Sequence, residues 1–195
     1  VSDGENGPIP ADSIECLHVD KDLEWMQPGV TLPIKFCGDK MFSSDNSGIL
    51  IGGCNGDNVS DEIYEISLNP PDKPKLLTQL PEPRCCHGSE IIDNQVIVAG
   101  GRTSNYFKDT KNTVYAYDLN NNECKTLSPL PFSVSDMATV SYKDNIILIG
   151  GVNEKDQTLN SVVMYDVKTG KVKMLPCLNY KRAGSAAVIT GNVII

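Results

Sequence analysis

The sequence is poor in aromatic residues and histidine, and it lacks long apolar runs. Aromatic side chains make up 6% of its 195 residues, and there are one tryptophan and two histidines. No apolar run approaches the roughly 18 residues of a membrane span, and the opening VSDGENGPIP lacks the basic and apolar regions of a secretory signal. We therefore expect no membrane span and a cytoplasmic location, although a mature chain could have lost a signal.

Basic residues are fewer than acidic residues. Twenty-five acids against 17 bases give a formal net charge of −8, which repels the phosphates of nucleic acid and the anionic face of a membrane. Neither is an expected partner. The remaining composition, 40% hydrophobic and 22% charged, is that of a globular protein, and a chain of this length can build a core without metal or disulfide.

The cysteine pattern predicts reduced thiols. The seven cysteines are an odd number and include no CxxC pair, so the sequence favours neither a disulfide framework nor a zinc site. Cys85 and Cys86 are adjacent; a redox switch is one interpretation, and small apolar side chains in a packed sheet are the favoured one. The two histidines, His18 and His87, are interpreted as structural, and we expect neither a metal nor a cofactor.

An internal repeat is the strongest pattern in the chain. The glycine pair beginning at Gly52 recurs at Gly100 and Gly150, which gives periods of 48 and 50 residues, and each pair closes an apolar run: GILIGG, QVIVAGG and NIILIGG. Each pair is preceded by a small-residue stretch and followed by two further segments with strand-like alternation. Four strands in a repeat of about 50 residues are typical of a propeller blade.

The strand chemistry agrees with this interpretation. Inner strands crowd around a propeller axis and favour small residues, as in the run Ala183–Ala187. A second strand, covered by blades on both sides, should be apolar on both faces, as residues 146–149 are. The glycines allow sharp turns and close backbone approach.

These segments resemble the kelch repeat. The glycine pair, the Tyr-Asp of Tyr117-Asp118 and the Leu-Pro of Leu80-Pro81 and Leu130-Pro131 stand in the order that the family shows. The resemblance implies an all-β fold, a kelch-type β-propeller segment. We expect an open arc of three full four-stranded blades between two half blades, with ranges 1–33 (half blade), 36–80, 84–130, 134–178 (full blades) and 182–195 (half blade), which together form a fragment of a longer parent chain.

Arginine placement suggests a binding face. The chain has three arginines, Arg84, Arg102 and Arg182, and all fall in loops that share one face of an up-and-down propeller. A guanidinium holds a carboxylate through two hydrogen bonds. Arg84 and Arg182 occupy equivalent repeat positions, at which the BTB-kelch class, by resemblance, has a ligand contact. Bracing of a neighbouring loop is an equally weighted interpretation.

The loop after Arg102 adds contact chemistry. Ser104, Asn105, Tyr106 and Phe107 supply adaptable donors and aromatic area, a mixture typical of protein-binding surfaces. No nucleophile elbow, P-loop or dinucleotide fingerprint occurs, so we expect no catalytic residues. The segment GGCNGDN, with Asp57, resembles a phosphate loop only loosely and is interpreted as a solvated turn.

The predicted function is recognition of a protein or peptide partner, with an acidic partner favoured by the arginines. By resemblance, such modules serve as substrate receptors of cullin-based ubiquitin ligases when joined to a BTB or F-box domain. Two alternatives stay open. One is an actin-binding or cytoskeletal kelch protein, and the other is a kelch-fold enzyme such as a sialic acid epimerase or a copper radical oxidase. The missing blades of the parent chain would be further partners.

Overall fold

The repeated segments fold into three four-stranded antiparallel sheets, each in the chain order of its strands. The computed structural model describes residues 11–13, 16–17, 25–26, 31–36, 40–44, 47–56, 58–67 and 73–195. The first sheet contains β5 (Lys40–Ser44), β6 (Ser47–Ile51), β9 (Glu62–Ser67) and β10 (Lys75–Gln79). The second contains β11 (Gly88–Ile92), β12 (Gln95–Ala99), β13 (Val114–Asp118) and β14 (Cys124–Leu127). The third contains β15 (Ala138–Tyr142), β16 (Asn145–Ile149), β17 (Val162–Asp166) and β18 (Val172–Leu175).

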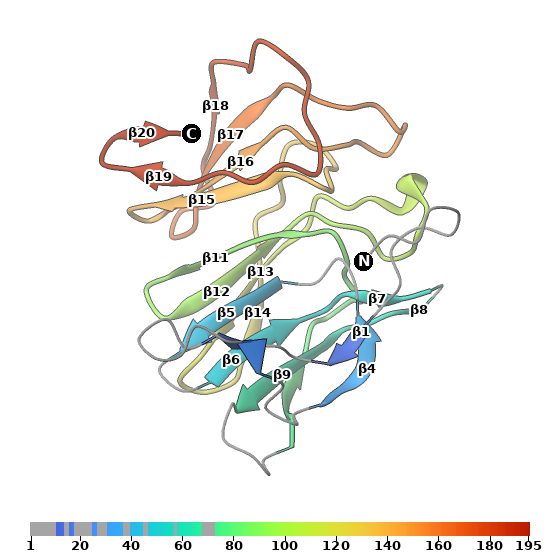
Figure 1. Ribbon diagram of the computed structural model, residues 1–195. Helices are drawn as coiled ribbons and strands as arrows, with labels where there is room; N and C mark the ends of the chain where they lie inside the picture. The colour runs from blue at the N-terminus through green and yellow to red at the C-terminus, as the bar shows by residue number, and fades with distance from the viewer. Residues whose placement is uncertain are drawn as a thin grey trace.

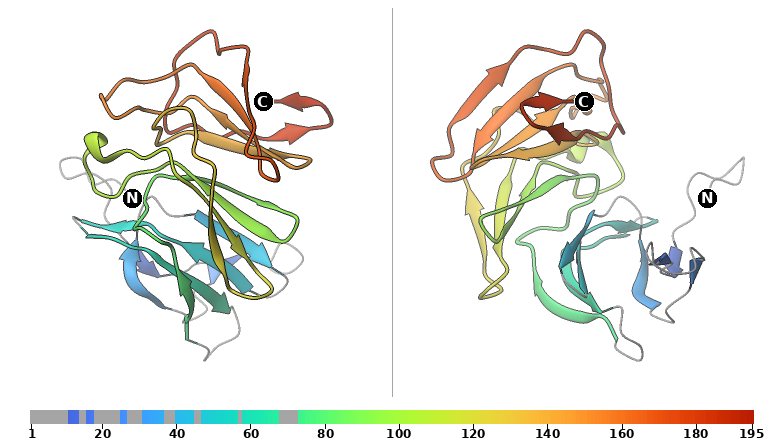
Figure 2. Two further views of the ribbon diagram at one scale, coloured as in Figure 1. Left: turned by 180° about the vertical axis from the view of Figure 1, so that it is seen from behind. Right: turned by 60° about the vertical axis from the view of Figure 1, so that its left-hand side comes forward.

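The sheets follow one another as an arc of propeller blades (Figures 1 and 2). Their first strands lie innermost, because β11 contacts β15 and β15 contacts β19 (Ile189–Thr190). Their last strands, β10, β14 and β18, are largely exposed. The only helical element among the described residues is a three-residue 3-10 turn, η1 (Phe107–Asp109). The all-β propeller arc predicted from the sequence is confirmed.

The core lies between neighbouring sheets. All but the first residue of β6, β12 and β16 are buried on both faces, as the sequence predicts for second strands. One cluster joins Ile97 and Ala99 of the second sheet to Ile146 and Leu148 of the third. Burying each isoleucine or leucine side chain of this cluster stabilises the fold by roughly 1.5–3 kcal/mol, so packing between blades is a large source of apolar stabilisation.

The glycine pairs tie each blade to the next. Gly100 has φ +63°, and a Cβ at this position would lie 2.3 Å from the carbonyl oxygen of Val134. Only a residue without a side chain allows this approach. The second glycine of each pair donates its N–H to the residue that opens the next blade, in the bonds Gly53 to Arg84 (2.8 Å), Gly101 to Val134 (2.8 Å) and Gly151 to Arg182 (2.7 Å).

The ends of the chain differ from the sequence prediction. In the first half blade, β2 (Cys16–Leu17) pairs with β3 (Trp25–Met26), and His18 lies outside the described residues. A further pair joins β1 (Ala11–Ser13) to β4 (Thr31–Phe36). The sequence pattern does not single out β4, which contains Pro33, a residue unable to donate to a ladder, and β4 runs past the boundary expected at residue 33.

The other end has a shorter inner strand than expected. Residues 183–187 form no strand, and the ladder of β19 with β20 (Val193–Ile194) begins only where Val188 pairs with Ile195. Residues 183–185 correspond to 85–87 and 135–137, which form no strand in the other blades either, so only 186–187 of this run match an inner strand elsewhere. The small-residue run was therefore wrongly predicted as a strand in this blade.

Candidate functional site

The loops after the glycine pairs gather on one side of the arc. We call this surface the rim, formed by residues 54–56, 58–61, 81–87, 102–113, 131–137, 152–161 and 178–186. The hairpin of β7 (Cys54–Asn55) with β8 (Asn58–Val59) and the turn η1 lie on this side, and the hairpin turns β11–β12 and β15–β16 lie opposite (Figure 1). The glycine-rich loop is thus a β-hairpin; Asp57 lies outside the described residues.

Arg84 does not face a partner. Its side chain is fully buried, and its Nη2 donates to Tyr115 (3.1 Å), to Thr113 and to Glu82 (2.8 Å). The guanidinium carbon also lies 5.4 Å from the centroid of the Tyr115 ring. Of the two interpretations of Arg84, the burial agrees with bracing, because Thr113, just before β13, and Tyr115, in β13, place a hydroxyl and a phenol within reach of the blade opening.

Arg182 has the backbone position of Arg84 and a different side-chain environment. Its carbonyl accepts from the preceding glycine pair, as that of Arg84 does. Its side chain is exposed. Thr113 and Tyr115, which accept hydrogen bonds from Arg84, follow it by 29 and 31 residues.

Arg102 is largely buried and joins two blades. Its Nη2 lies 2.9 Å from the Sγ of Cys86 and 3.5 Å from an Oδ1 of Asp136, and 12% of its side chain is exposed. The ring of Phe107 covers the guanidinium at 4.6 Å. Arg102 thus supports the rim from beneath rather than projecting from it, which favours the bracing interpretation.

The loop that follows Arg102 is held rigidly by its own polar groups. The Ser104 hydroxyl donates to Asp109 (2.6 Å) and accepts from the backbone N–H of Tyr106 (3.0 Å). The Asn105 side chain donates to the carbonyl of Gly56 in the preceding blade. Tyr106 remains 65% exposed. Ser104 and Asn105 therefore brace the loop, and Tyr106 is its most accessible large side chain.

A chain of backbone hydrogen bonds links the blade openings at the inner end of the rim. Cys86, Asp136 and Gly184 occupy equivalent positions and all have positive φ, at 53°, 55° and 61°. The N–H of Asp136 donates to Cys86 (2.9 Å), and that of Gly184 donates to Asp136 (2.8 Å). The sequence singles out Cys86 and Arg102 separately and does not pair them. Their pairing follows from the antiparallel bridge between Cys85 and Arg102.

The histidine in the described region is structural. His87 is 3% exposed, and its Nε2 lies 3.2 Å from the carbonyl oxygen of Ile51. This is the packed, hydrogen-bonded position that the sequence predicts. Among the residues that the structure describes, no three His, Cys, Asp or Glu side chains are grouped so as to hold a metal ion.

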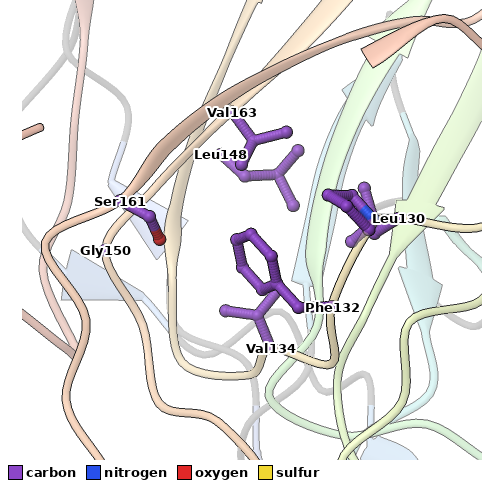
Figure 3. A pocket seen from close by; sticks show the side chains of 8 residues that line it. Leu130, Phe132, Val134, Leu148, Gly150, Ser161 and Val163 are labelled. Carbon is purple, nitrogen blue, oxygen red and sulfur yellow. The ribbon is translucent and has the colours of Figure 1, made fainter. Parts of the chain in front are cut away.

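Two hollows lie between blades. A small apolar pocket separates the second and third sheets (Figure 3) and is lined by Leu130, Pro131, Phe132, Val134, Leu148, Gly150, Ser161 and Val163. Phe132 points into it from the segment that joins the two sheets. A larger, open cleft between the first and second sheets, near the turns opposite the rim, has polar and apolar walls that include Glu65, Lys75, Asn94 and Tyr117. Neither hollow contains Arg84, Arg102 or Arg182.

Comparison with known families agrees with the blade geometry. Residues 4–195 match the family described as KLHDC2/KLHL20/DRC7 Kelch-repeats domain. The chain belongs to the kelch-repeat family. It is 28% identical to mouse (Mus musculus) Kelch-like protein 40 over 161 residues, which are 80% of this chain and 26% of that protein. It is 27% identical to the Kelch repeat and BTB domain-containing protein 2 of cowpox virus (strain GRI-90 / Grishak) over 140 residues, 64% of this chain and 25% of that protein.

The kelch chain spans about a quarter of the length of these relatives. Among solved structures it is similar to one described as "Structure of YjhT", with a TM-score of 0.78 and 15% identity over 96% of this chain and 72% of that chain. At this identity the likeness shows the fold alone. In the part of the kelch chain that the structure describes, no helix has the length and apolar character needed to cross a membrane.

Proposed function

We propose that this kelch chain is the interaction module of a longer protein, which recognises a protein or peptide partner through the rim and does not itself catalyse a reaction. Kelch propellers are typically protein-interaction modules, and the family membership supports this role. The observation that carries the proposal is the braced loop 103–109, which presents Tyr106 65% exposed at the rim.

The geometry of this loop suits a binding hot spot. Tyrosine offers large contact area for few rotatable bonds, and a loop already fixed by hydrogen bonds loses little conformational entropy on binding. The Nζ of Lys108 lies 5.3 Å from the Tyr106 ring centroid, so the tip combines an aromatic face with a cation. Arg102, under Phe107, keeps this tip in place.

The charges of the rim support an acidic partner. Among the described rim residues, the exposed charged residues are Lys108, Lys155, Lys181 and Arg182 against Glu154 and Asp156, and the Glu82 side chain is also 46% exposed. The rim is thus locally cationic on a chain whose formal net charge is −8. Complementary charge accelerates association and is screened by salt.

The finer part of the proposal is a receptor role in a cullin-based ubiquitin ligase, in the cytoplasm. It is supported by relatives with kelch-like names and by a viral relative whose name includes a BTB domain. In such an assembly the rim would hold the target, and the transfer chemistry would belong to other subunits. Co-purification of the full-length protein with a cullin scaffold tests this part separately.

The rim is tested by comparing two tyrosine–lysine pairs on opposite faces. Tyr106 and Lys108 lie on the rim, and Tyr142 and Lys143 lie at the opposite turns with the same cation–ring distance of 5.3 Å. In the full-length protein we expect the double change Tyr106→Ala and Lys108→Ala to reduce recovery of bound partners at least tenfold, because hot-spot truncation costs about 2 kcal/mol or more.

The control is the double change Tyr142→Ala and Lys143→Ala, which should leave recovery within twofold of wild type. Thermal melting of both variants verifies folding. Recovery that persists in the rim variant, or falls equally in both, would overturn the rim assignment. Recovery that does not decrease between 50 and 300 mM salt would overturn the acidic partner while leaving the rim assignment standing.

A further inference from the structure

A thiol, a guanidinium and a carboxylate meet where two blades adjoin. The Nη2 of Arg102 donates to the Sγ of Cys86 at 2.9 Å and lies 3.5 Å from Asp136. Cys86 is partly exposed, and Cys85 behind it is fully buried. A cation at hydrogen-bond distance stabilises a thiolate, which is the nucleophilic form of cysteine.

The backbone gives an independent reason to single out Cys86. Its φ of 53° lies in the left-handed region, which costs an ordinary residue about 1 kcal/mol or more and which Gly, Asn and Asp tolerate best. The equivalent positions hold Asp136 and Gly184. The repeat backbone imposes positive φ at this position in all three blade openings, and in this blade it holds the Cys86 thiol beside Arg102.

We propose that Cys86 is a modification site, a thiolate held by Arg102 that is oxidised by a hydroperoxide. The sulfur attacks one peroxide oxygen, an S–O bond forms and the O–O bond breaks. With hydrogen peroxide the products are a sulfenic acid on Cys86 and hydroxide, which leaves with the electron pair of the broken O–O bond; sulfur is oxidised and peroxide oxygen is reduced.

The charges around Cys86 support this assignment. The hydrogen bond from the Cys85 thiol lowers the pKa of Cys86, and so do the hydrogen bond and charge of Arg102. Burial and the Asp136 carboxylate oppose them, and the net direction is downward. Cys124 provides the contrast: it is also partly exposed, and burial raises its pKa to about 11.

The site lies within the rim, beneath loop 103–109, and its chemistry does not depend on partner binding. Arg102 contacts Cys86 through Nη2 and Phe107 through its guanidinium face. Oxidation of Cys86 therefore adds an oxygen next to the side chain that supports loop 103–109. The chemistry at Cys86 stands whether or not the rim binds a partner.

The test measures the rate at which each cysteine of the folded, full-length protein is alkylated by iodoacetamide at pH 7, with peptides quantified by mass spectrometry. The thiolate displaces iodide and forms a C–S bond. We expect Cys86 to react at least tenfold faster than Cys124. Lowering a thiol pKa by one unit gives about ten times more thiolate and about threefold less nucleophilicity, a net gain of roughly threefold.

Two substitutions distinguish the effect of neighbouring charges on the alkylation rate of Cys86 from the effect of solvent access to its sulfur. Arg102→Gln removes the cation and opens space, so we expect Cys86 to react about threefold more slowly despite easier access. Asp136→Asn removes the opposing carboxylate at a position where asparagine tolerates positive φ, so Cys86 should react faster. General unfolding would instead accelerate Cys124 in both variants.

The oxidation itself is read as dimedone trapping of sulfenic acid after brief hydrogen peroxide treatment. Trapping should occur on Cys86 in wild type and fall at least threefold in Arg102→Gln. Cys86 reacting no faster than Cys124, an unchanged rate in Arg102→Gln, or the absence of dimedone adducts on Cys86 would each overturn the proposal.

Discussion

The contact between a glycine and the next blade can be tested by adding a single methyl group. In Gly100→Ala the new Cβ would lie 2.3 Å from the Val134 carbonyl oxygen, at φ +63°. Left-handed backbone costs alanine about 1–2 kcal/mol. The overlap forces the carbonyl away and weakens the 2.8 Å hydrogen bond that it accepts from Gly101. Losing this bond adds about 0.5–1.5 kcal/mol to the destabilisation, and the loss of packing between the sheets adds more. We expect a total of about 3 kcal/mol.

A second glycine provides the matched control. Gly56 has φ +58°, and a Cβ there meets nothing within 4 Å. Gly56→Ala should therefore show the backbone cost alone, about 1–2 kcal/mol. Differential scanning calorimetry of the full-length protein measures both, and a loss of 1 kcal/mol lowers the melting temperature of a domain of 150–250 residues by about 2–4 °C. If Gly100→Ala melts no lower than Gly56→Ala, the contact between blades does not have the role assigned to it.

Two further substitutions test the contacts between blade segments. The hydrogen bond from Arg84 lowers the pKa of Glu82, so this pair contributes stability above the unfolded pKa of a glutamate, near 4.3, that is lost as pH falls through the lower folded value. Melting curves from pH 6 to pH 3 should therefore show a smaller acid-induced drop in Arg84→Met than in wild type, and an equal drop would refute the pairing. The Tyr165 hydroxyl donates to Ser128 in the preceding blade at 2.7 Å; Tyr165→Phe should lower stability by about 1 kcal/mol, measured by urea unfolding, whereas no change would show that water replaces the bond.

The periodic backbone could be predicted from the sequence because its causes are local. A glycine pair at the end of an apolar run requires positive φ and close approach, and three copies specify the same contact three times. The buried second strands follow from the absence of polar residues in runs such as 146–149. The prediction was wrong at residues 183–187, where composition alone suggested a strand: residues 183–185 hold the positions of 85–87 and 135–137, which open the other blades without forming strands.

The side chains of the site could not be predicted in the same way. Arg84 and Arg102 both fall in loops, yet the first side chain is fully buried and the second is 12% exposed. The burial of Arg84 comes from Thr113, just before β13, and Tyr115, in β13, which accept hydrogen bonds from it. The repeat position determines where the backbone places the arginine. The residues about 30 positions later determine which hydrogen bonds its guanidinium makes and whether it is buried.

The same reasoning explains why the repeats can carry different chemistry on one backbone. The bridge that joins Cys85 to Arg102 recurs between Ser135 and Val152. The hydrogen bonds of the glycine pairs and of these bridges use only main-chain atoms. The fold therefore does not require a particular side chain at the bridging positions. Of these two bridges, the first brings a guanidinium to a neighbouring thiol, and the second replaces that arginine with valine. A property of one blade opening is therefore not transferred to the others by symmetry, and a substitution at Val152 should leave Cys86 reactivity unchanged where Arg102→Gln reduces it.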